Sequence, residues 1–218
     1  MNGLFITFEG TEGAGKSTHI HLLAERLRRL GRTVRELREP GGTPLGEEIR
    51  HLLKHHPSGH GMTSEAELLL MNASRAQLVR EVIRPALAAG EVVLCDRFYD
   101  STTAYQGHGR GLDLKLVESV ITAAVGATHP NLTLLLHVPL SVSESRRLTR
   151  QNEQQAPADY FEKSDRAFFE RVERGFQAIA AAEPQRVQVV DAAQSIEAVA
   201  ADIWQHVEPL AAGNAGRR

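Results

Sequence analysis

The chain has 218 residues, 42% of them hydrophobic, and a formal net charge of −2. This length and composition fit one folded α/β domain and exclude a disordered chain. The balanced charge argues against a protein that binds nucleic acid through a basic surface, and the single cysteine, Cys95, excludes an internal disulfide bond.

Five apolar runs of strand length alternate with amphipathic segments of helix length. The runs span residues 4–8, 33–37, 91–95, 132–138 and 187–190, and the second is polar enough for an edge strand. The helical segments span residues 17–30, 64–89, 161–182 and 196–207, and a further helix is expected to start at Ser141. This alternation predicts a parallel, doubly wound sheet with helices on both faces.

Two predicted helices begin with a capping-box pattern, Ser64-x-x-Glu67 and Ser141-x-x-Glu144. We expect one domain over residues 1–210, a loop over residues 51–63, a short lid over about residues 147–162 and a disordered tail over residues 211–218. No apolar stretch approaches the ~20 residues of a membrane span, and the start lacks the pattern of a signal peptide. We therefore expect a cytoplasmic protein with no membrane partner.

The clearest motif is the glycine-rich stretch at residues 10–17, which matches G-x-x-x-x-G-K-[ST] in full. It follows the first predicted strand and opens the first predicted helix, the context in which backbone N–H groups converge on phosphate oxygens. Lys16 is expected to reach the β- and γ-phosphates of ATP, and the Ser17 hydroxyl to bind Mg²⁺. The predicted ATP-binding residues of this segment are Gly10, Thr11, Glu12, Gly13, Ala14, Gly15, Lys16, Ser17 and Thr18.

Asp96 follows the third predicted strand directly. Ligands of doubly wound sheets bind at the carboxyl ends of the strands, so Asp96 should face the same crevice as the glycine-rich stretch. We expect it to hold Mg²⁺ through water, and the alternative is an ordinary turn or helix-capping aspartate.

Three arginines after the fourth predicted strand indicate phosphoryl transfer rather than a GTPase, whose guanine-reading Asn-Lys-x-Asp does not occur in the chain. Arg147 and Arg150 are three residues apart and share a helix face, and on a closing flap they would neutralise charge in the transition state. Arg146 points in another direction and is expected on a solvated helix face.

Three further segments resemble the thymidylate kinase family: Arg38-Glu39-Pro40-Gly41-Gly42-Thr43, Asp96-Arg97-Phe98, and the stretch AYQGHGRG at residues 104–111. The resemblance covers residues 4 to about 209. It implies a P-loop NTPase fold with strand order 2-3-1-4-5, a homodimer, and transfer of the ATP γ-phosphoryl group to dTMP with Mg²⁺. The Glu-Gly-x-Glu-Gly-x-Gly-Lys form of the glycine-rich stretch resembles the bacterial members.

The resemblance also implies roles for individual residues. Glu12 would reach the sugar 3′-hydroxyl of dTMP, Tyr105 would occupy the space of a ribose 2′-hydroxyl, and Arg147 would lie near the adenine. The implied catalytic residues are Lys16, Asp96, Arg97, Arg147 and Arg150. The implied dTMP-binding residues are Glu12, Arg38, Met71, Arg75, Arg97, Ser101, Tyr105 and Gln106, and the implied metal site comprises Ser17, Asp96 and Glu162.

The chain departs from the family pattern at three positions. Met71 stands where the family has a phenylalanine that stacks on thymine, and it either covers the base or is simply core. Tyr160 replaces a lid arginine, which shifts its task to Arg147 or Arg150. His137 stands where the family tends to have aspartate, and we interpret it as structural.

The sequence leaves two other functions open. One is a kinase for a different acceptor, such as dUMP, another monophosphate or a deoxynucleoside. The other is an ATP-dependent switch, which would bind ATP without turnover stimulated by an acceptor.

Overall fold

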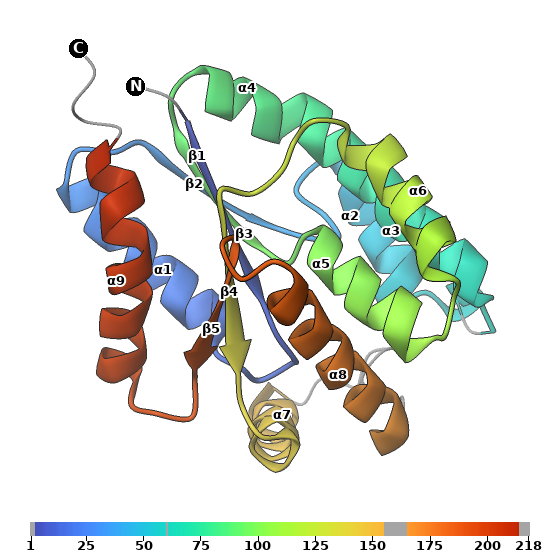
Figure 1. Ribbon diagram of the computed structural model, residues 1–218. Helices are drawn as coiled ribbons and strands as arrows, with labels where there is room; N and C mark the ends of the chain where they lie inside the picture. Colours follow the sequence, from blue (N-terminus) through green and yellow to red (C-terminus); the bar gives the residue numbers. More distant parts are fainter. Residues whose placement is uncertain (1–2, 60, 155–164, 214–218) are drawn as a thin grey trace.

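The computed structural model describes residues 3–59, 61–154 and 165–213. Strands and helices alternate along the chain, with short 3₁₀ or π-helical turns (η1 to η3) between some of them (Figure 1). The strands are β1 (Leu4–Glu9), β2 (Val34–Arg38), β3 (Val92–Asp96), β4 (Leu132–His137) and β5 (Val187–Asp191). The helices and turns are α1 (Lys16–Arg29), α2 (Pro44–Lys54), η1 (Pro57–Gly59), α3 (Ser64–Leu78), η2 (Val79–Ile83), α4 (Arg84–Ala88), α5 (Tyr99–Thr102), η3 (Thr103–Gly109), α6 (Leu114–Val125), α7 (Leu140–Gln154), α8 (Arg166–Ala182) and α9 (Ile196–Gly213).

The five strands form one parallel sheet in the order β2-β3-β1-β4-β5, which confirms the predicted fold class and the edge position of the second strand. Phe8 of β1 lies in register with Asp96 of β3, and Arg38 of β2 lies in register with the same Asp96. The carboxyl ends of three strands thus meet at one edge. The segments that follow them are brought together there.

Helices cover both faces of the sheet, with α1 and α9 on one side and α3 to α6 on the other (Figure 1). Alternate residues of β1 serve the two cores, because successive side chains of a strand point to opposite faces. Ile6 belongs to the core cluster that includes Leu23 of α1 and Ile203 of α9, whereas Phe5 belongs to the cluster that α3 and α6 share. Every β1 residue is buried, as a strand covered on both faces requires.

Glycines let η3 and α8 approach closely. A Cβ on Gly109 would come 2.7 Å from the Phe168 ring, and one on Gly175 would come 2.9 Å from the His108 ring. Gly109 and Gly175 therefore allow the close packing of η3 against α8. This packing holds Tyr105 of η3 against Phe168 and Phe176, with ring centroids 6.0 and 6.2 Å away.

Both predicted capping boxes are wrong. Thr63 caps α3 by accepting a hydrogen bond from the Ala66 N–H at 3.3 Å, and Glu67 turns inward instead of back to the helix start. Helix α7 begins at Leu140, so Ser141 lies inside its first turn.

Three other expectations also change. Helix α2, capped by Thr43 and opened by Pro44, occupies the start of the expected loop over residues 51–63. Helix α7 extends to Gln154 and so includes the first residues of the expected lid, while α9 extends to Gly213 into the expected tail. The rest of the lid and tail predictions lies outside the described residues.

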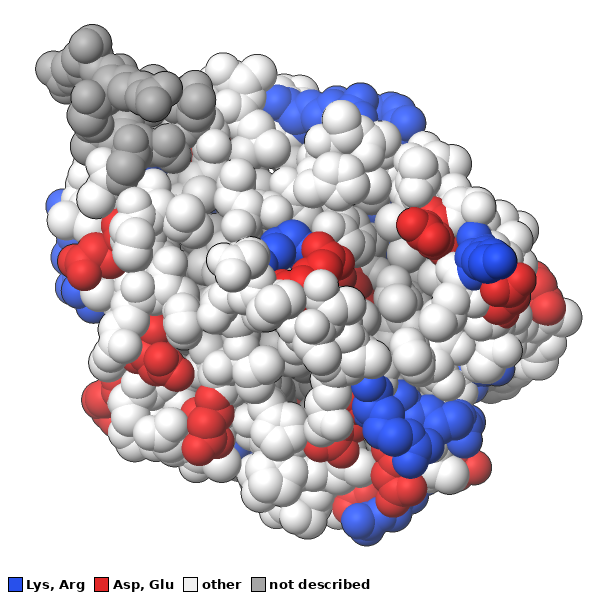
Figure 2. Space-filling view, viewed as in Figure 1, with Lys and Arg blue, Asp and Glu red and all other residues white. Residues whose placement is uncertain are grey.

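Positive and negative side chains are interspersed on the face shown in Figure 2, between wide areas of uncharged surface. This pattern agrees with the net charge of −2. Among the residues that the structure describes, none of the helices combines the length and apolar character that crossing a bilayer needs.

Candidate active site

The glycine-rich stretch forms a tight turn between β1 and α1. Gly10, Gly13 and Gly15 have φ values of +128°, +78° and +88°, which L-residues with a side chain rarely adopt. A Cβ on Gly10 would lie 2.3 Å from the Leu136 carbonyl oxygen. The turn therefore has the shape in which backbone N–H groups converge on an anion at a helix N-terminus.

Lys16 is buried within this turn, where its Nζ donates to the carbonyl oxygens of Gly10 at 3.1 Å and Thr11 at 2.9 Å. Burial and the nearby charge of Arg97 lower the pKa of Lys16 from its usual value. Both effects disfavour the ammonium ion, so an incoming phosphate would stabilise it by adding a negative partner.

Ser17 and Asp96 meet as the sequence predicted. The Ser17 Oγ donates to Asp96 Oδ2 at 3.1 Å, and among the described residues the buried Oδ1 atom of Asp96 has no hydrogen-bond partner. A hydroxyl and a carboxylate with an open oxygen suit Mg²⁺, which takes oxygen ligands and fills its remaining positions with water and substrate phosphates. These residues fit that ion.

Arg97 lies between the glycine-rich stretch and η3. Its backbone adopts φ +70°, and its N–H donates to the Phe8 carbonyl oxygen at 2.9 Å. Its guanidinium donates to Ser101 Oγ at 3.0 Å, Glu12 Oε1 at 3.0 Å and Tyr105 Oη at 3.3 Å. Only 14% of the side chain is exposed, so these three hydrogen bonds fix the cation beside the glycine-rich turn.

Glu12 stays ionised beside Arg97. Burial alone would raise the pKa of Glu12, but the positive charges of Arg97 and Lys16 outweigh it and bring the pKa well below its usual range. Burial raises the pKa of Tyr105 to about 12 despite the neighbouring Arg97, so its hydroxyl keeps its proton at neutral pH. A fixed carboxylate and a neutral phenol therefore flank the arginine.

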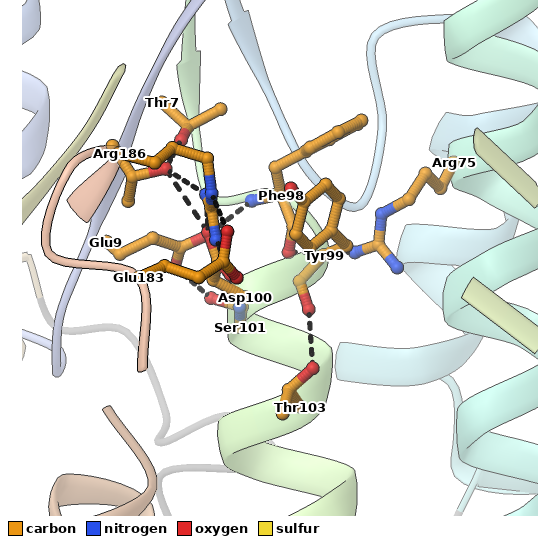
Figure 3. A network of polar contacts seen from close by, with 11 residues as sticks. Thr7, Glu9, Arg75, Phe98, Tyr99, Asp100, Ser101, Thr103, Glu183 and Arg186 are labelled. Atoms are coloured by element: carbon orange, nitrogen blue, oxygen red, sulfur yellow. Dashed lines mark hydrogen bonds and ion pairs between the residues drawn. The ribbon is translucent and has the colours of Figure 1, made fainter. Parts of the chain in front are cut away.

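Glu9, the last residue of β1, holds the start of α5 in place (Figure 3). Its carboxylate accepts hydrogen bonds from the Phe98 N–H at 2.7 Å, the Ser101 N–H at 3.3 Å and the Ser101 hydroxyl. Burial and the nearby Asp100 raise the pKa of Glu9 to about 7, against the opposing effect of Arg97. We did not assign this residue from the sequence, although an acid at the end of an otherwise apolar strand was a visible signal.

Asp100 ties the same turn to β4 and to the start of β5. Its two carboxylate oxygens accept hydrogen bonds from the Arg186 guanidinium at 2.7 and 2.8 Å (Figure 3). Thr133 also donates to Asp100, and Glu183 accepts from Arg186. The segment carrying Arg97 and Ser101 is thus anchored from β1 by Glu9 and from the start of β5 by Arg186.

Arg75 lies deep in the protein, with 2% of the residue exposed. It donates to Glu39 Oε2, Asn72 Oδ1, Thr102 Oγ1 and the Phe98 carbonyl oxygen, at 2.8 to 3.0 Å. Nη1 has two of these acceptors, and Nε and Nη2 have one each, while Nη2 also lies 2.7 Å from Glu39 Oε2 in an ion pair. Four of the five guanidinium N–H groups therefore donate hydrogen bonds to the described residues.

The other predicted acceptor-side residues differ in burial and in partners. Ser101 and Gln106 are buried, Met71 is half-buried against the cluster that contains Tyr105, and Arg38 is exposed and paired with Glu47 at 2.8 Å. Gln106 Nε2 donates to Glu67 Oε1 at 2.7 Å. Glu67 was missed as a site residue because its place in a capping-box pattern explained it otherwise.

Arg146 is exposed on α7, as expected, and it has contacts that were not predicted. Its guanidinium donates to the carbonyl oxygens of Gly13 and Ala192, both at 3.3 Å. Ser143 of the same helix donates to the Glu12 carbonyl oxygen at 2.6 Å, so α7 rests on the glycine-rich turn. Arg147 and Arg150 belong to this helix and their roles stay predictions, while Glu162 lies outside the described residues.

His137 is structural in its contacts, as expected, since its Nε2 lies 2.9 Å from Glu173 Oε1 of α8.

Comparison with known proteins agrees with this geometry. A model of the thymidylate kinase family matches residues 8–203. Thymidylate kinases of Pseudomonas syringae pv. tomato and Pseudomonas putida are 51% and 50% identical to the chain, each over 93% of it and 94% of their own length. The crystal structure of thymidylate kinase from Ehrlichia chaffeensis superposes with a TM-score of 0.76 at 33% identity, over 95% of this chain and 99% of that one. This chain belongs to the thymidylate kinase family.

Proposed function

We propose that the protein transfers the γ-phosphoryl group of ATP to dTMP, giving dTDP and ADP on the route to dTTP for DNA synthesis, with Mg²⁺ bound. Membership of the thymidylate kinase family supports the reaction. The observation that carries it is Arg97, a half-buried cation fixed between the glycine-rich turn and the Tyr105 hydroxyl. An arginine in that place can contact a second phosphate group beside ATP.

On the donor side, backbone N–H groups of residues 10–18 would hold the ATP phosphates, and Lys16 would exchange its carbonyl partners for phosphate oxygens. Ser17 and Asp96 would hold Mg²⁺, directly and through water, and Glu162 would support that shell. Mg²⁺ held by these residues would supply positive charge that offsets the charge of the phosphates. Arg147 and Arg150 would close over the donor, with Arg147 near the adenine.

On the acceptor side, Arg38 and Arg97 would clamp the dTMP phosphate, and Glu12 would reach the 3′-hydroxyl. Met71 would cover the thymine, with Arg75, Ser101 and Gln106 at its edges. The Tyr105 ring, packed against Phe168 and Phe176, would fill the space that a ribose 2′-hydroxyl needs.

The chemistry needs positioning rather than a general base. A phosphate monoester has a second pKa of ~6, so most dTMP is already a nucleophilic dianion at neutral pH. Two anions must nevertheless approach each other, and guanidinium groups in fixed, bidentate geometry offset their repulsion. Lys16, Arg38, Arg97 and a lid arginine would supply four positive charges around the transferred group.

We further propose that the protein is a cytoplasmic homodimer, with one catalytic domain over residues 1–210 and a lid over about residues 147–162. Its substrates would be small molecules, with no nucleic-acid or membrane partner.

The test is purified protein with ATP and Mg²⁺ against dTMP, dUMP, dCMP and the ribonucleotide of thymine, with diphosphate and ADP formation both measured. We expect dTMP to react fastest and dUMP about 10- to 100-fold less efficiently, since one methyl group gives only ~1–3 kcal/mol of discrimination. A preference for the ribonucleotide would refute the role of Tyr105. ADP formation at one rate with or without acceptor would favour an ATP-dependent switch.

A further inference from the structure

Glu67 is a buried carboxylate with no part in phosphate binding. It lies on α3 with 1% of its side chain exposed, and it has two partners from the η3 region. Gln106 Nε2 donates to Oε1 at 2.7 Å, and Arg110 Nη2 donates to Oε2 at 3.0 Å. Arg110 itself packs over the Phe168 ring, 4.5 Å from its centroid. The buried charge of Glu67 is therefore compensated within a rigid group.

This arrangement determines which end of the Gln106 amide faces Glu67. An ionised carboxylate can only accept hydrogen bonds, so Gln106 must present its NH₂ group to it. Gln106 is 2% exposed, which leaves its side chain little room to move away from Glu67. Its Oε1 consequently points away from Glu67, and within the described part of the chain that oxygen accepts no hydrogen bond.

The position of Gln106 relative to Met71 places the Gln106 amide where its orientation would matter to a bound base. Glu67, Met71 and Arg75 are spaced four residues apart and lie on one face of α3. Two polar bridges connect that face to the α5–η3 segment, from Arg75 to Thr102 at 2.9 Å and from Glu67 to Gln106 at 2.7 Å. Half-buried Met71 lies between the two bridges. A planar base resting on Met71 would have the Gln106 amide at one edge.

We propose that Glu67 is a positioning residue that makes Gln106 a hydrogen-bond acceptor and thereby selects pyrimidines that carry a proton on N3. Thymine and uracil donate from N3, whereas neutral cytosine accepts there and would face the Gln106 oxygen with two acceptors opposed. The inference rests on the proposed function, because it assumes that the base lies against Met71 and Gln106.

The experiment compares kcat/KM for dTMP, dUMP and dCMP in the wild type, in Glu67→Gln and in the matched control Glu65→Gln. The dUMP/dCMP ratio isolates the N3 and C4 groups, because neither base carries the thymine methyl, and the dTMP/dUMP ratio reports the methyl alone. A glutamine at position 67 can donate or accept, so the terminal amide of Gln106 is no longer held with its NH₂ group towards position 67, and its oxygen can face there instead. We expect the dUMP/dCMP ratio to fall about tenfold or more in Glu67→Gln, with the dTMP/dUMP ratio unchanged. Glu65 is exposed on the same helix, so Glu65→Gln should keep both ratios.

A merely structural Glu67 would lower kcat/KM for all three acceptors by the same factor, and an unchanged dUMP/dCMP ratio in Glu67→Gln would overturn the proposal. If that variant does not fold, Gln106→Met serves instead, since it removes the acceptor and leaves Glu67 paired with Arg110. It should collapse the dUMP/dCMP ratio, and retention of the ratio would also overturn the proposal. A wild type that phosphorylates neither dTMP nor dUMP would refute the proposed function itself.

Discussion

Arg97 adopts a left-handed backbone conformation that costs a non-glycine residue roughly 1–2 kcal/mol. The surrounding bonds hold it there: its own N–H is bonded to Phe8, and the next residue, Phe98, donates its N–H to Glu9. The conformation turns the side chain from the end of β3 towards Glu12 and Tyr105. Local strain at this residue thus places a cation where the two phosphates are proposed to meet.

Glu9 gives the stability of the protein a pH dependence. The pKa of Glu9 rises from 4.5 to about 7 on folding, so the folded state holds the Glu9 proton more tightly than the unfolded state does. The contribution of this proton to the free energy of unfolding is therefore present at low pH and is lost as pH rises through about 7. The shift corresponds to about 3 kcal/mol. In urea unfolding at pH 5 and pH 8, Glu9→Gln should lose less stability with rising pH than the wild type. Equal losses in the two proteins would contradict the buried, protonated carboxyl.

Met71 offers a second prediction at the residue scale. If it covers the thymine, Met71→Phe should lower the KM for dTMP about three- to tenfold, because a rigid ring stacks on a base better than a flexible thioether. Steady-state kinetics with dTMP varied at saturating ATP measures this. An unchanged KM would mean that Met71 is simply core.

At the scale of elements, the glycine-rich turn and α7 act as one unit. Ser143 and Arg146 of α7 donate to carbonyl oxygens of the turn, and a Cβ on Gly13 would lie 3.0 Å from the Ser143 carbonyl oxygen. The first turns of α7, which continues into the proposed lid, are therefore attached to the turn that is proposed to bind the ATP phosphates. A movement of α7 would therefore displace the glycine-rich turn, and a movement of the turn would displace α7.

Gly13→Ala tests this contact, and Gly31→Ala is its matched control. Both glycines have φ +78°, but a Cβ on Gly31 would meet nothing within 4 Å. Each variant should lose about 1 kcal/mol of stability from backbone strain. Only Gly13→Ala should also weaken ATP binding, by about tenfold or more, as measured by calorimetry. Equal ATP affinity in both variants would show that the approach of α7 is unimportant to the site.

At the scale of the whole molecule, the sequence predicted what depends on strong local patterns. The alternation of apolar runs with helical segments predicted the parallel sheet, and the family resemblance predicted its strand order. The glycine-rich stretch and the position of Asp96 after a strand predicted that Ser17 and Asp96 lie together. Short patterns that fit more than one structure gave wrong predictions. Glu67 fits a capping box, yet Thr63 caps the helix and Glu67 accepts a hydrogen bond from Gln106 of η3. Contacts between residues far apart in the chain, such as Arg146 with Gly13 or Asp100 with Arg186, have no local signal at all.

The most direct test of the account is the turnover of Arg97→Ala, compared with Arg29→Ala, which removes an exposed arginine on α1. Removing the cation between two phosphates should lower kcat for dTMP about a thousandfold, while the Kd for ATP, bound mainly by the glycine-rich turn, changes less than about threefold. Arg29→Ala should match the wild type in both. Near-normal turnover of a folded Arg97→Ala would contradict the central claim that this fixed guanidinium brings the two phosphates together.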